Sequence, residues 1–140
     1  MRAVVQTVSR ASVTVDGAVV GAIGEGLLVL VGATHTDTVE DAEKLARKVH
    51  QLRIFDQDRS AADANLPVLA VSQFTLYGDV RKGRRPSWTA AAPAELAEPL
   101  IDAFTEALRR AGAEVQTGKF QAKMLVESVN VGPRTLILEV

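Results

Sequence analysis

A short segment after an apolar run combines residue types that suit chemistry better than packing. Residues 72–77 have the sequence Ser-Gln-Phe-Thr-Leu-Tyr, so polar and aromatic side chains stand where a core strand ought to continue apolar. Such side chains at the end of a buried strand favour a binding or catalytic site. The alternative is a strand that surfaces into a loop, with Ser72 and Thr75 making local hydrogen bonds. The residue types leave both interpretations open.

A second unusual segment is residues 130–135, Asn-Val-Gly-Pro-Arg-Thr, between two apolar runs. Glycine adopts backbone angles that other residues avoid and proline fixes φ, so Gly132-Pro133 makes a rigid corner with an approachable carbonyl. An ordinary turn would use the same residues. A cis peptide bond before Pro133 would set the corner apart, because only about 5% of X-Pro bonds in folded proteins are cis.

Cations cluster between these two segments. Residues 81–88 contain Arg81, Lys82, Arg84 and Arg85, followed by Trp88. Arginine and lysine bind phosphates, and an indole ring stacks on nucleobases. The whole chain has a formal net charge of -1, so it has no general attraction for nucleic acid, and any RNA contact must be local. The alternative is a solvated loop with no ligand.

The residues that are absent narrow the chemistry. There is no cysteine, which excludes disulfides, thiolate nucleophiles and cysteine metal sites. His35 and His50 are the two histidines, and their spacing does not suit a metal pair. We expect His35 to lie exposed in a loop, and His50 to have a structural role near a helix end, where a cation complements the dipole. No metal and no cofactor are predicted.

Phosphate-loop and serine-hydrolase motifs are also missing. Gly21, Gly24 and Gly26 lack the order of the dinucleotide fingerprint, and no Lys-Ser or Lys-Thr follows them, so we expect turn glycines. There is no Gly-x-Ser-x-Gly elbow, which argues against a conventional triad with a serine nucleophile. An enzyme built on this chain would have to work without one.

β-Branched residues and alternating hydrophobicity predict the strands that carry these segments. Residues 2–8 and 11–15 form two strands, Asp16-Gly17 makes a hairpin turn, and residues 18–20 return. Residues 26–31 are predicted to be a central strand covered on both faces. The remaining strands are predicted at residues 67–73, 113–116, 123–129 and 134–140.

Two amphipathic helices follow from apolar residues spaced three and four apart. The first begins after Thr38, whose spacing to Asp41 resembles a capping box. Its inward residues are Val39, Ala42, Leu45, Ala46, Val49 and Leu52. The second covers residues 94–111 before Gly112, with Pro99 opening or kinking it. Its inward residues are Ala97, Leu100, Ile101, Phe104, Ala107, Leu108 and Ala111.

These elements predict a single mixed α/β domain spanning residues 1–140. Residues 56–65 are polar and small, which predicts a loop. The opening residues lack the continuous apolar core of a signal peptide, and no run approaches the ~20 apolar residues of a membrane span. We therefore expect a cytoplasmic protein with no membrane contact.

Four motifs, in order along nearly the whole chain, make the sequence resemble the D-aminoacyl-tRNA deacylase family. They are Val-Gln-x-Val-Ser-Arg-Ala-Ser-Val at residues 5–13, Ser-Gln-Phe-Thr-Leu at 72–76, Lys-Gly-x-Arg-Pro-Ser at 82–87, and Asn-x-Gly-Pro-x-Thr at 130–135. The resemblance implies a mixed, largely antiparallel β-sheet or barrel with two amphipathic helices, assembled as a homodimer. It also implies an enzyme that hydrolyses the ester bond of D-aminoacyl-tRNA.

The resemblance assigns roles to the residues of these motifs. The catalytic pocket would be lined by Ser72, Gln73, Phe74 and Thr75. A corner held by a cis bond would enter the partner subunit's pocket and select chirality, with the residues Asn130, Gly132, Pro133 and Thr135. Contacts to tRNA would come from Arg81, Lys82, Arg84 and Arg85.

An aminoacyl ester is already activated, so a site need only orient water and stabilise the oxyanion, for which backbone N–H groups near Phe74 and Thr75 are suited. The resemblance implies that the tRNA 2′-hydroxyl takes part. Thr75 would position the substrate, since no base is available to activate its hydroxyl as a nucleophile. A filter that rejects L side chains by a clash would pass achiral glycine, so glycyl-tRNA, including glycine mischarged on tRNA(Ala), is an expected second substrate.

Some positions depart from the family's usual pattern. Thr7 stands where the family usually has Arg, Lys123 where it tends to have Asp, and Val131 and Arg134 flank the Gly-Pro pair in place of Asp and Val. Gaining an arginine at 134 either compensates for the loss at 7 or alters chirality control.

Three alternative functions remain open. They are a relaxed relative that acts on L-alanyl-tRNA, a non-catalytic RNA-binding module that uses residues 81–88, and an unrelated small α/β hydrolase.

Overall fold

The longest strands of the chain, β1 and β6, run beside each other in a six-stranded sheet. The computed structural model describes all 140 residues. The strands are β1 (Arg2–Val15), β2 (Ala18–Ile23), β3 (Gly26–Gly32), β4 (Val68–Ser72), β5 (Val115–Thr117) and β6 (Leu125–Glu139). Their order is β2-β1-β3-β4-β5, with β6 paired to β1. Because β3 and β5 are parallel to β4 and the other pairs are antiparallel, the sheet is mixed.

β1 is one strand, so the prediction of two strands at residues 2–8 and 11–15 was wrong. The strand continues because its neighbours change along it: β3 pairs with residues 2–8, β2 pairs with residues 11–15, and β6 lies along both halves. Ser9 and Arg10, exposed at the change of partner, resemble a turn in sequence. The predicted hairpin is confirmed, since Asp16 and Gly17 both have positive φ angles, 49° and 78°.

β3 is the predicted central strand. It pairs with β1 on one side and β4 on the other, and every residue of it is buried except Leu30. A strand covered on both faces needs apolar residues at every position, not alternation. The prediction of a central strand covered on both faces, made from the continuous apolar run, is therefore confirmed.

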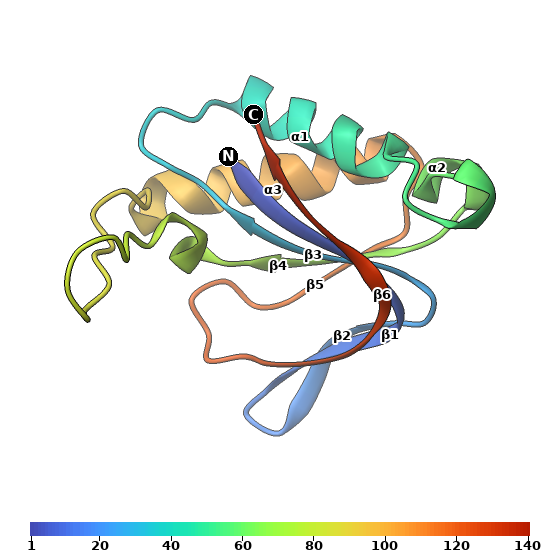
Figure 1. Ribbon diagram of the computed structural model, residues 1–140, viewed down its shortest axis with the longest axis horizontal. Coiled ribbons are helices and arrows are strands. Elements are labelled where there is room, and N and C mark those ends of the chain that lie inside the picture. The colour runs from blue at the N-terminus through green and yellow to red at the C-terminus, as the bar shows by residue number, and fades with distance from the viewer.

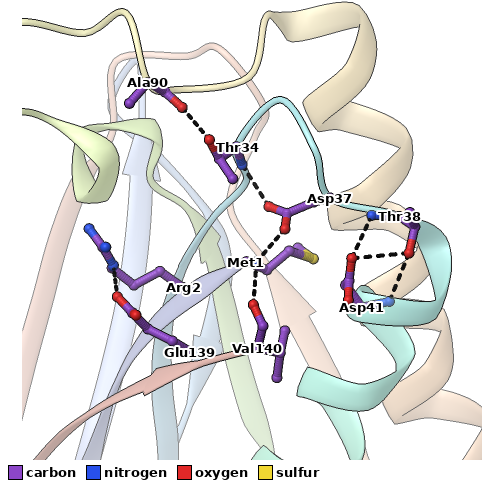
Figure 2. Close-up of polar contacts among 9 residues, drawn as sticks. All are labelled: Met1, Arg2, Thr34, Asp37, Thr38, Asp41, Ala90, Glu139 and Val140. Carbon is purple, nitrogen blue, oxygen red and sulfur yellow. Dashed lines mark hydrogen bonds and ion pairs between the residues drawn. The ribbon is translucent and has the colours of Figure 1, made fainter.

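The first long helix, α1 (Val39–Gln51), has the predicted capping box. The Thr38 hydroxyl accepts the Asp41 N–H, and the Asp41 carboxylate accepts the Thr38 N–H at 2.9 Å (Figure 2). These hydrogen bonds hold the pKa of Asp41 below its usual value. Val39 is exposed, contrary to the predicted stripe, because it lies in the first turn, ahead of the contact with the sheet.

The second long helix, α3 (Ala94–Arg110), is continuous through Pro99. It buries Ala97, Leu100, Phe104 and Leu108 as predicted, leaves Ile101 and Ala107 half-buried, and exposes Ala111, which follows the last helical residue. Gly112 has a φ of 97°, the left-handed conformation that ends helices.

Residues 56–65 are not a simple loop. They form a 3-10 turn, η1 (Asp56–Asp58), and a one-turn helix, α2 (Ala61–Ala64). The Ser60 hydroxyl accepts the Asp63 N–H, and the Asp63 carboxylate accepts the Ser60 N–H. This second capping box has the same spacing as the one at Thr38, so the signal was present in the sequence and was missed.

The predicted strands at residues 123–129 and 134–140 are both part of β6, which passes through the Gly132-Pro133 corner without ending. The pairing jumps from Val8↔Asn130 to Gln6↔Thr135, so the single residue Thr7 faces the four residues 131–134. A turn would have separated two strands, whereas a bulge lets β6 keep its partner on both sides.

Two hydrophobic cores lie on opposite faces of the sheet. The larger core lies between the sheet and helices α1 and α3, which run side by side over one face (Figure 1). The smaller lies within the curled sheet and includes Val8, Val13, Leu28, Leu69 and Val71. Gly21 of β2 packs against the Thr117 carbonyl of β5, so the sheet forms a nearly closed barrel. None of the helices is long and apolar enough to cross a membrane.

Met1 makes a buried ion pair with Asp37 and a backbone hydrogen bond with Val140 at the other end of the chain. The Met1 amine donates to the Asp37 carboxylate at 2.6 Å, and the other oxygen of Asp37 accepts the Thr34 N–H at 2.7 Å (Figure 2). The Val140 N–H donates to the Met1 carbonyl at 3.1 Å. These contacts join the ends of β1 and β6 to the loop that leads from β3 into α1.

The prediction of turn glycines holds for Gly24 but is wrong for Gly21, which lies within β2, and for Gly26, which begins β3. A Cβ on Gly26 would overlap the Pro67 carbonyl oxygen, while a Cβ on Gly24 would have no atom within 4 Å. We expect Gly26→Ala to lower the free energy of unfolding by about 1–3 kcal/mol through overpacking. The matched variant Gly24→Ala should change it by less than about 0.5 kcal/mol. Urea denaturation of both variants measures this, and equal losses would contradict the assigned packing.

Candidate functional site

The polar segment after β4 is a 3-10 turn, not the end of a strand. β4 stops at Ser72, the Gln73 N–H donates to the Val31 carbonyl at 2.8 Å, and η2 (Phe74–Tyr77) follows. The turn brings the side chains of residues 72–75 to the end of the central strands. The sequence indicates polar side chains at the end of this strand but not the turn that presents them.

Two backbone donors are free at the start of η2. Phe74 and Thr75 are the first two residues of η2, whose first hydrogen bond runs from the Leu76 N–H to the Gln73 carbonyl, so their own N–H groups have no acceptor within the turn. The Gln73 side-chain amide donates to the Thr75 hydroxyl, which leaves the hydroxyl proton of Thr75 available. No His, Asp or Glu hydrogen bonds to this hydroxyl, so no residue acts as its base. The Thr75 hydroxyl can donate a hydrogen bond to an oxygen but is not activated to attack a carbonyl carbon.

Contacts from two neighbouring strands hold η2 in place. The Arg2 guanidinium of β1 donates to the Leu76 carbonyl at 2.6 Å, lies 4.6 Å from the centre of the Tyr77 ring, and pairs with Glu139 of β6. On the β3 side, a Cβ on Gly32 would lie 2.7 Å from the Gln73 carbonyl oxygen. The role of Arg2 was not predicted, since no local pattern relates it to Leu76, 74 positions away in the sequence.

An apolar cavity of about 530 Å³ opens beside η2. Most of its wall is hydrophobic and comes from β3, β4, α3 and the segment before β6, including Val31, Val71, Ile101, Phe120 and Met124. Ser72, Gln73 and Phe74 form part of its lining, and Thr75 does not. Three of the four predicted catalytic residues therefore share one cavity. Lys123 lies exposed next to Met124.

Hydrogen bonds from β1 fix the corner at residues 130–135. The buried Thr7 hydroxyl donates to the Val131 carbonyl at 2.8 Å, and the Asn130 amide donates to the Thr7 carbonyl at 2.9 Å. The Gln6 amide donates to the Thr135 hydroxyl at 2.9 Å. The Gly132-Pro133 peptide bond is cis, and both residues are exposed.

Arg134 braces the same corner from the other direction. Its guanidinium pairs with the Asp56 carboxylate in η1 and holds the pKa of Asp56 below its usual value. None of the residues 130–135 lines the cavity beside η2. Within one chain, the two groups of predicted site residues therefore lie apart.

The loop that contains the cluster of cations, residues 79–87, is closed by a bridge between Asp79 and Ser87. We call it the cationic loop. Arg81 makes two side-chain hydrogen bonds to Asp79, at 2.9 and 2.7 Å, which lower the pKa of Asp79 to about 2. Lys82, Arg84 and Arg85 form no ion pair. Of the four predicted tRNA contacts, three cations are thus free and Arg81 is already engaged.

Neither histidine has the environment of a catalytic group. His35 is exposed, as predicted, and its Nε2 lies 2.7 Å from the Thr89 carbonyl, so the ring tethers the end of the cationic loop. Burial lowers the pKa of His50, which favours the neutral ring and removes the expected charge at the helix end. No three residues among His, Asp and Glu lie together as a set of metal ligands.

Comparison with known proteins gives consistent matches over the whole chain. The family described as D-Tyr-tRNA(Tyr) deacylase matches residues 4–139. A protein named D-aminoacyl-tRNA deacylase from Acidothermus cellulolyticus is 64% identical, over 100% of this chain and 99% of the relative. One of the same name from Thermobifida fusca is 62% identical over 100% of both chains.

Solved structures agree on the fold. A protein described as c-Myc DNA Unwinding Element Binding Protein superposes with a TM-score of 0.94 at 42% identity, over 100% of this chain and 99% of the other. A structure described as a "probable eukaryotic D-amino acid tRNA deacylase" has a TM-score of 0.87 at 18% identity, over 99% of this chain and 98% of the other. The mixed α/β fold expected from the sequence is confirmed.

The single tyrosine reports on how η2 is packed. Burial raises the pKa of Tyr77 to about 12, with the nearby Asp37 acting in the same direction and Arg2 opposing it. We expect the absorbance of the phenolate to appear near pH 12 in the folded protein and near pH 10 in urea. Because the pKa is higher in the folded state, the unfolding free energy should fall as pH rises from 10 to 12. Ultraviolet titration at 295 nm measures the midpoint, and a folded-state midpoint near 10 would contradict this packing.

Proposed function

The chain belongs to the D-Tyr-tRNA(Tyr) deacylase family, and from that premise we propose how it hydrolyses the ester that links a D-amino acid to tRNA. It is a hydrolase that acts on an ester bond. The observation that carries the mechanism is the pair of free backbone donors, Phe74 N–H and Thr75 N–H, beside an apolar cavity. The reaction takes place in the cytoplasm, where we place the protein.

The reaction needs stabilisation of charge more than it needs a nucleophilic side chain. Water adds to the ester carbonyl carbon, and the carbonyl oxygen becomes an oxyanion that the free N–H groups of η2 stabilise. The intermediate then expels the ribose oxygen, which takes up a proton, and free D-amino acid and tRNA leave. The 2′-hydroxyl beside the ester assists the proton transfer. No metal or cofactor enters this scheme.

Thr75 has a positioning role in the proposal. Its hydroxyl accepts a hydrogen bond from Gln73 and keeps its own proton for donation. Attack by a serine or threonine hydroxyl requires an adjacent base, and none contacts this one. Gln73 and Thr75 therefore orient the ester or the attacking water, and Ser72 lines the cavity beneath them.

The proposal also includes a homodimer. β6 pairs with β1 on one edge and leaves its other edge unpaired along 15 residues. Its exposed apolar residues are Leu125, Val126, Val129, Val131, Leu136 and Ile137. A long unpaired edge with apolar side chains is a surface that normally pairs with another chain. A second copy on β6 would offer its exposed corner to a cavity that its own corner does not reach.

Chiral selection rests on that corner in the proposal. Exposed main-chain carbonyls at Gly132 and Pro133 accept the substrate's α-amino group and leave no space for an L side chain, so rejection comes from a clash. Glycine has no side chain and is accepted, including glycine on tRNA(Ala). Thr7 and Arg134, two of the four departures from the family pattern, each hold the corner through a different neighbour. That bracing favours compensation over relaxed action on L-alanyl-tRNA.

The experiment is deacylation of D-tyrosyl-, L-tyrosyl-, L-alanyl- and glycyl-tRNA by the purified protein. We expect the D-tyrosyl and glycyl esters to be cleaved and both L esters to be spared. Cleavage of L-alanyl-tRNA would replace the proposal with the relaxed relative. Binding of tRNA that weakens with salt, with no ester cleaved, would replace it with the RNA-binding module.

A matched pair of variants tests the oxyanion donors. Phe74 is the first residue of η2, a position that accommodates proline, so Phe74→Pro removes the N–H while keeping the turn. Phe74→Ala removes the same ring and keeps the N–H. We expect kcat of Phe74→Pro to fall below that of Phe74→Ala by a factor of about 10²–10³, the usual effect of one oxyanion donor. Single-turnover deacylation measures this, and equal rates would exclude the Phe74 N–H.

A further inference from the structure

An exposed aromatic pair connects the cavity to the cationic loop. Phe74 is 55% exposed and lines the cavity, and Trp88 is 45% exposed and directly follows the loop closed by Asp79 and Ser87. Their ring centres lie 5.7 Å apart with the planes at 71°. In this edge-to-face arrangement one ring points its edge at the face of the second ring, so neither face of the first ring is covered by the second. Large aromatic side chains left this exposed are an apolar surface available to a ligand.

Trp88 is held in place by the turn it covers. A Cβ on Gly78, the residue after η2, would lie 2.6 Å from the Cζ3 atom of Trp88. The indole therefore packs on the Gly78 backbone at close range, with no room for a larger residue there. A ring fixed in this way loses little freedom when a ligand stacks on it.

The cations lie in the loop that ends next to Trp88. Ser87, next to Trp88, lines a second hollow together with Asp79, Arg81, Lys82 and Arg85. Arg81 is paired with Asp79, while Lys82 and Arg85 are free for anions. In Figure 1 this loop extends away from the sheet, between η2 and the start of α3. The order along the surface is therefore cavity, Phe74, Trp88, cations.

We propose that Phe74 and Trp88 form a stacking platform for the unpaired nucleotide that precedes the aminoacylated terminal adenosine. Lys82, Arg84 and Arg85 bind the phosphates on the 5′ side of that nucleotide. This rests on the proposed function, because an ester held at η2 sets where the preceding nucleotides must pass. Stacking uses the aromatic face of the base and needs no other feature of the tRNA. Because the nucleotide before the terminal adenosine belongs to the CCA end that tRNAs share, a platform for it suits an enzyme that acts on many tRNAs.

The test compares two substrates with the same ester. D-tyrosyl-tRNA has the preceding nucleotides, and 3′-O-(D-tyrosyl)adenosine does not. We expect Trp88→Ala to raise KM for the tRNA substrate about 5- to 100-fold, the range for loss of one stacked base, with kcat retained. The same variant should cleave the adenosine ester as the unaltered protein does, and Trp88→Phe should restore most of the affinity for tRNA.

The cations are tested by salt dependence. The double variant Arg84→Ala/Arg85→Ala should lower the slope of log KM against log salt for D-tyrosyl-tRNA by about 1–2, as expected when two phosphate contacts are removed. The control is Arg47→Ala, which removes an exposed cation from α1. A slope that falls equally in both variants would overturn the assignment of the phosphates to this loop.

A measurement on the unaltered protein tests the platform without depending on whether a variant folds. Trp88 is the only tryptophan, so its fluorescence reports on the platform alone. The unacylated trinucleotide CCA should quench it in a saturable manner. No quenching, or a Trp88→Ala variant that slows both esters equally, would show that the pair serves packing and overturn the proposal. Failure of the unaltered protein to cleave either ester would instead overturn the proposed function.

Discussion

The pairing of β1 on both of its edges is the interaction on which the rest of the structure depends. This strand hydrogen bonds first to β3 and then to β2, with β6 along its other side. Contacts with β1 hold both parts of the candidate site in place. Arg2, at its start, holds η2 through the Leu76 carbonyl, and Thr7, in its middle, holds the Gly132-Pro133 corner through the Val131 carbonyl. A shift of one residue in this pairing would turn both side chains to the other face and release both segments.

The chemistry that we propose for this scaffold relies on the backbone. η2 presents two N–H groups that have no acceptor within the turn, next to an apolar cavity in which a hydrogen bond to a developing charge is stronger than in water. An ester that is already activated needs little more than this. The absence of a conventional triad is consistent with a site whose donors come from the main chain.

The unpaired edge of β6 matters both for the monomer, which exposes it to solvent, and for the proposed dimer, which would cover it. An unpaired edge lined with exposed valine, leucine and isoleucine is costly in a monomer, because it invites association. The corner bulges from this same strand and has no contact with the cavity of its own chain. A dimer formed through β6 would cover the apolar residues and place the corner near a partner's η2 at the same time.

Local rules determined the parts of this protein that the sequence alone predicts. The Thr38–Asp41 box, the Asp16-Gly17 hairpin and the apolar run of β3 depend on residues within a few positions, so their signals are complete in the sequence. The motif at 72–76 located the candidate site for the same reason. Only tertiary structure decided that residues 2–15 and 125–139 are single strands, that Arg2 braces Leu76, and that Arg134 pairs with Asp56. Each of these depends on pairing between residues far apart in sequence, and such pairing exists only when the sheet has closed.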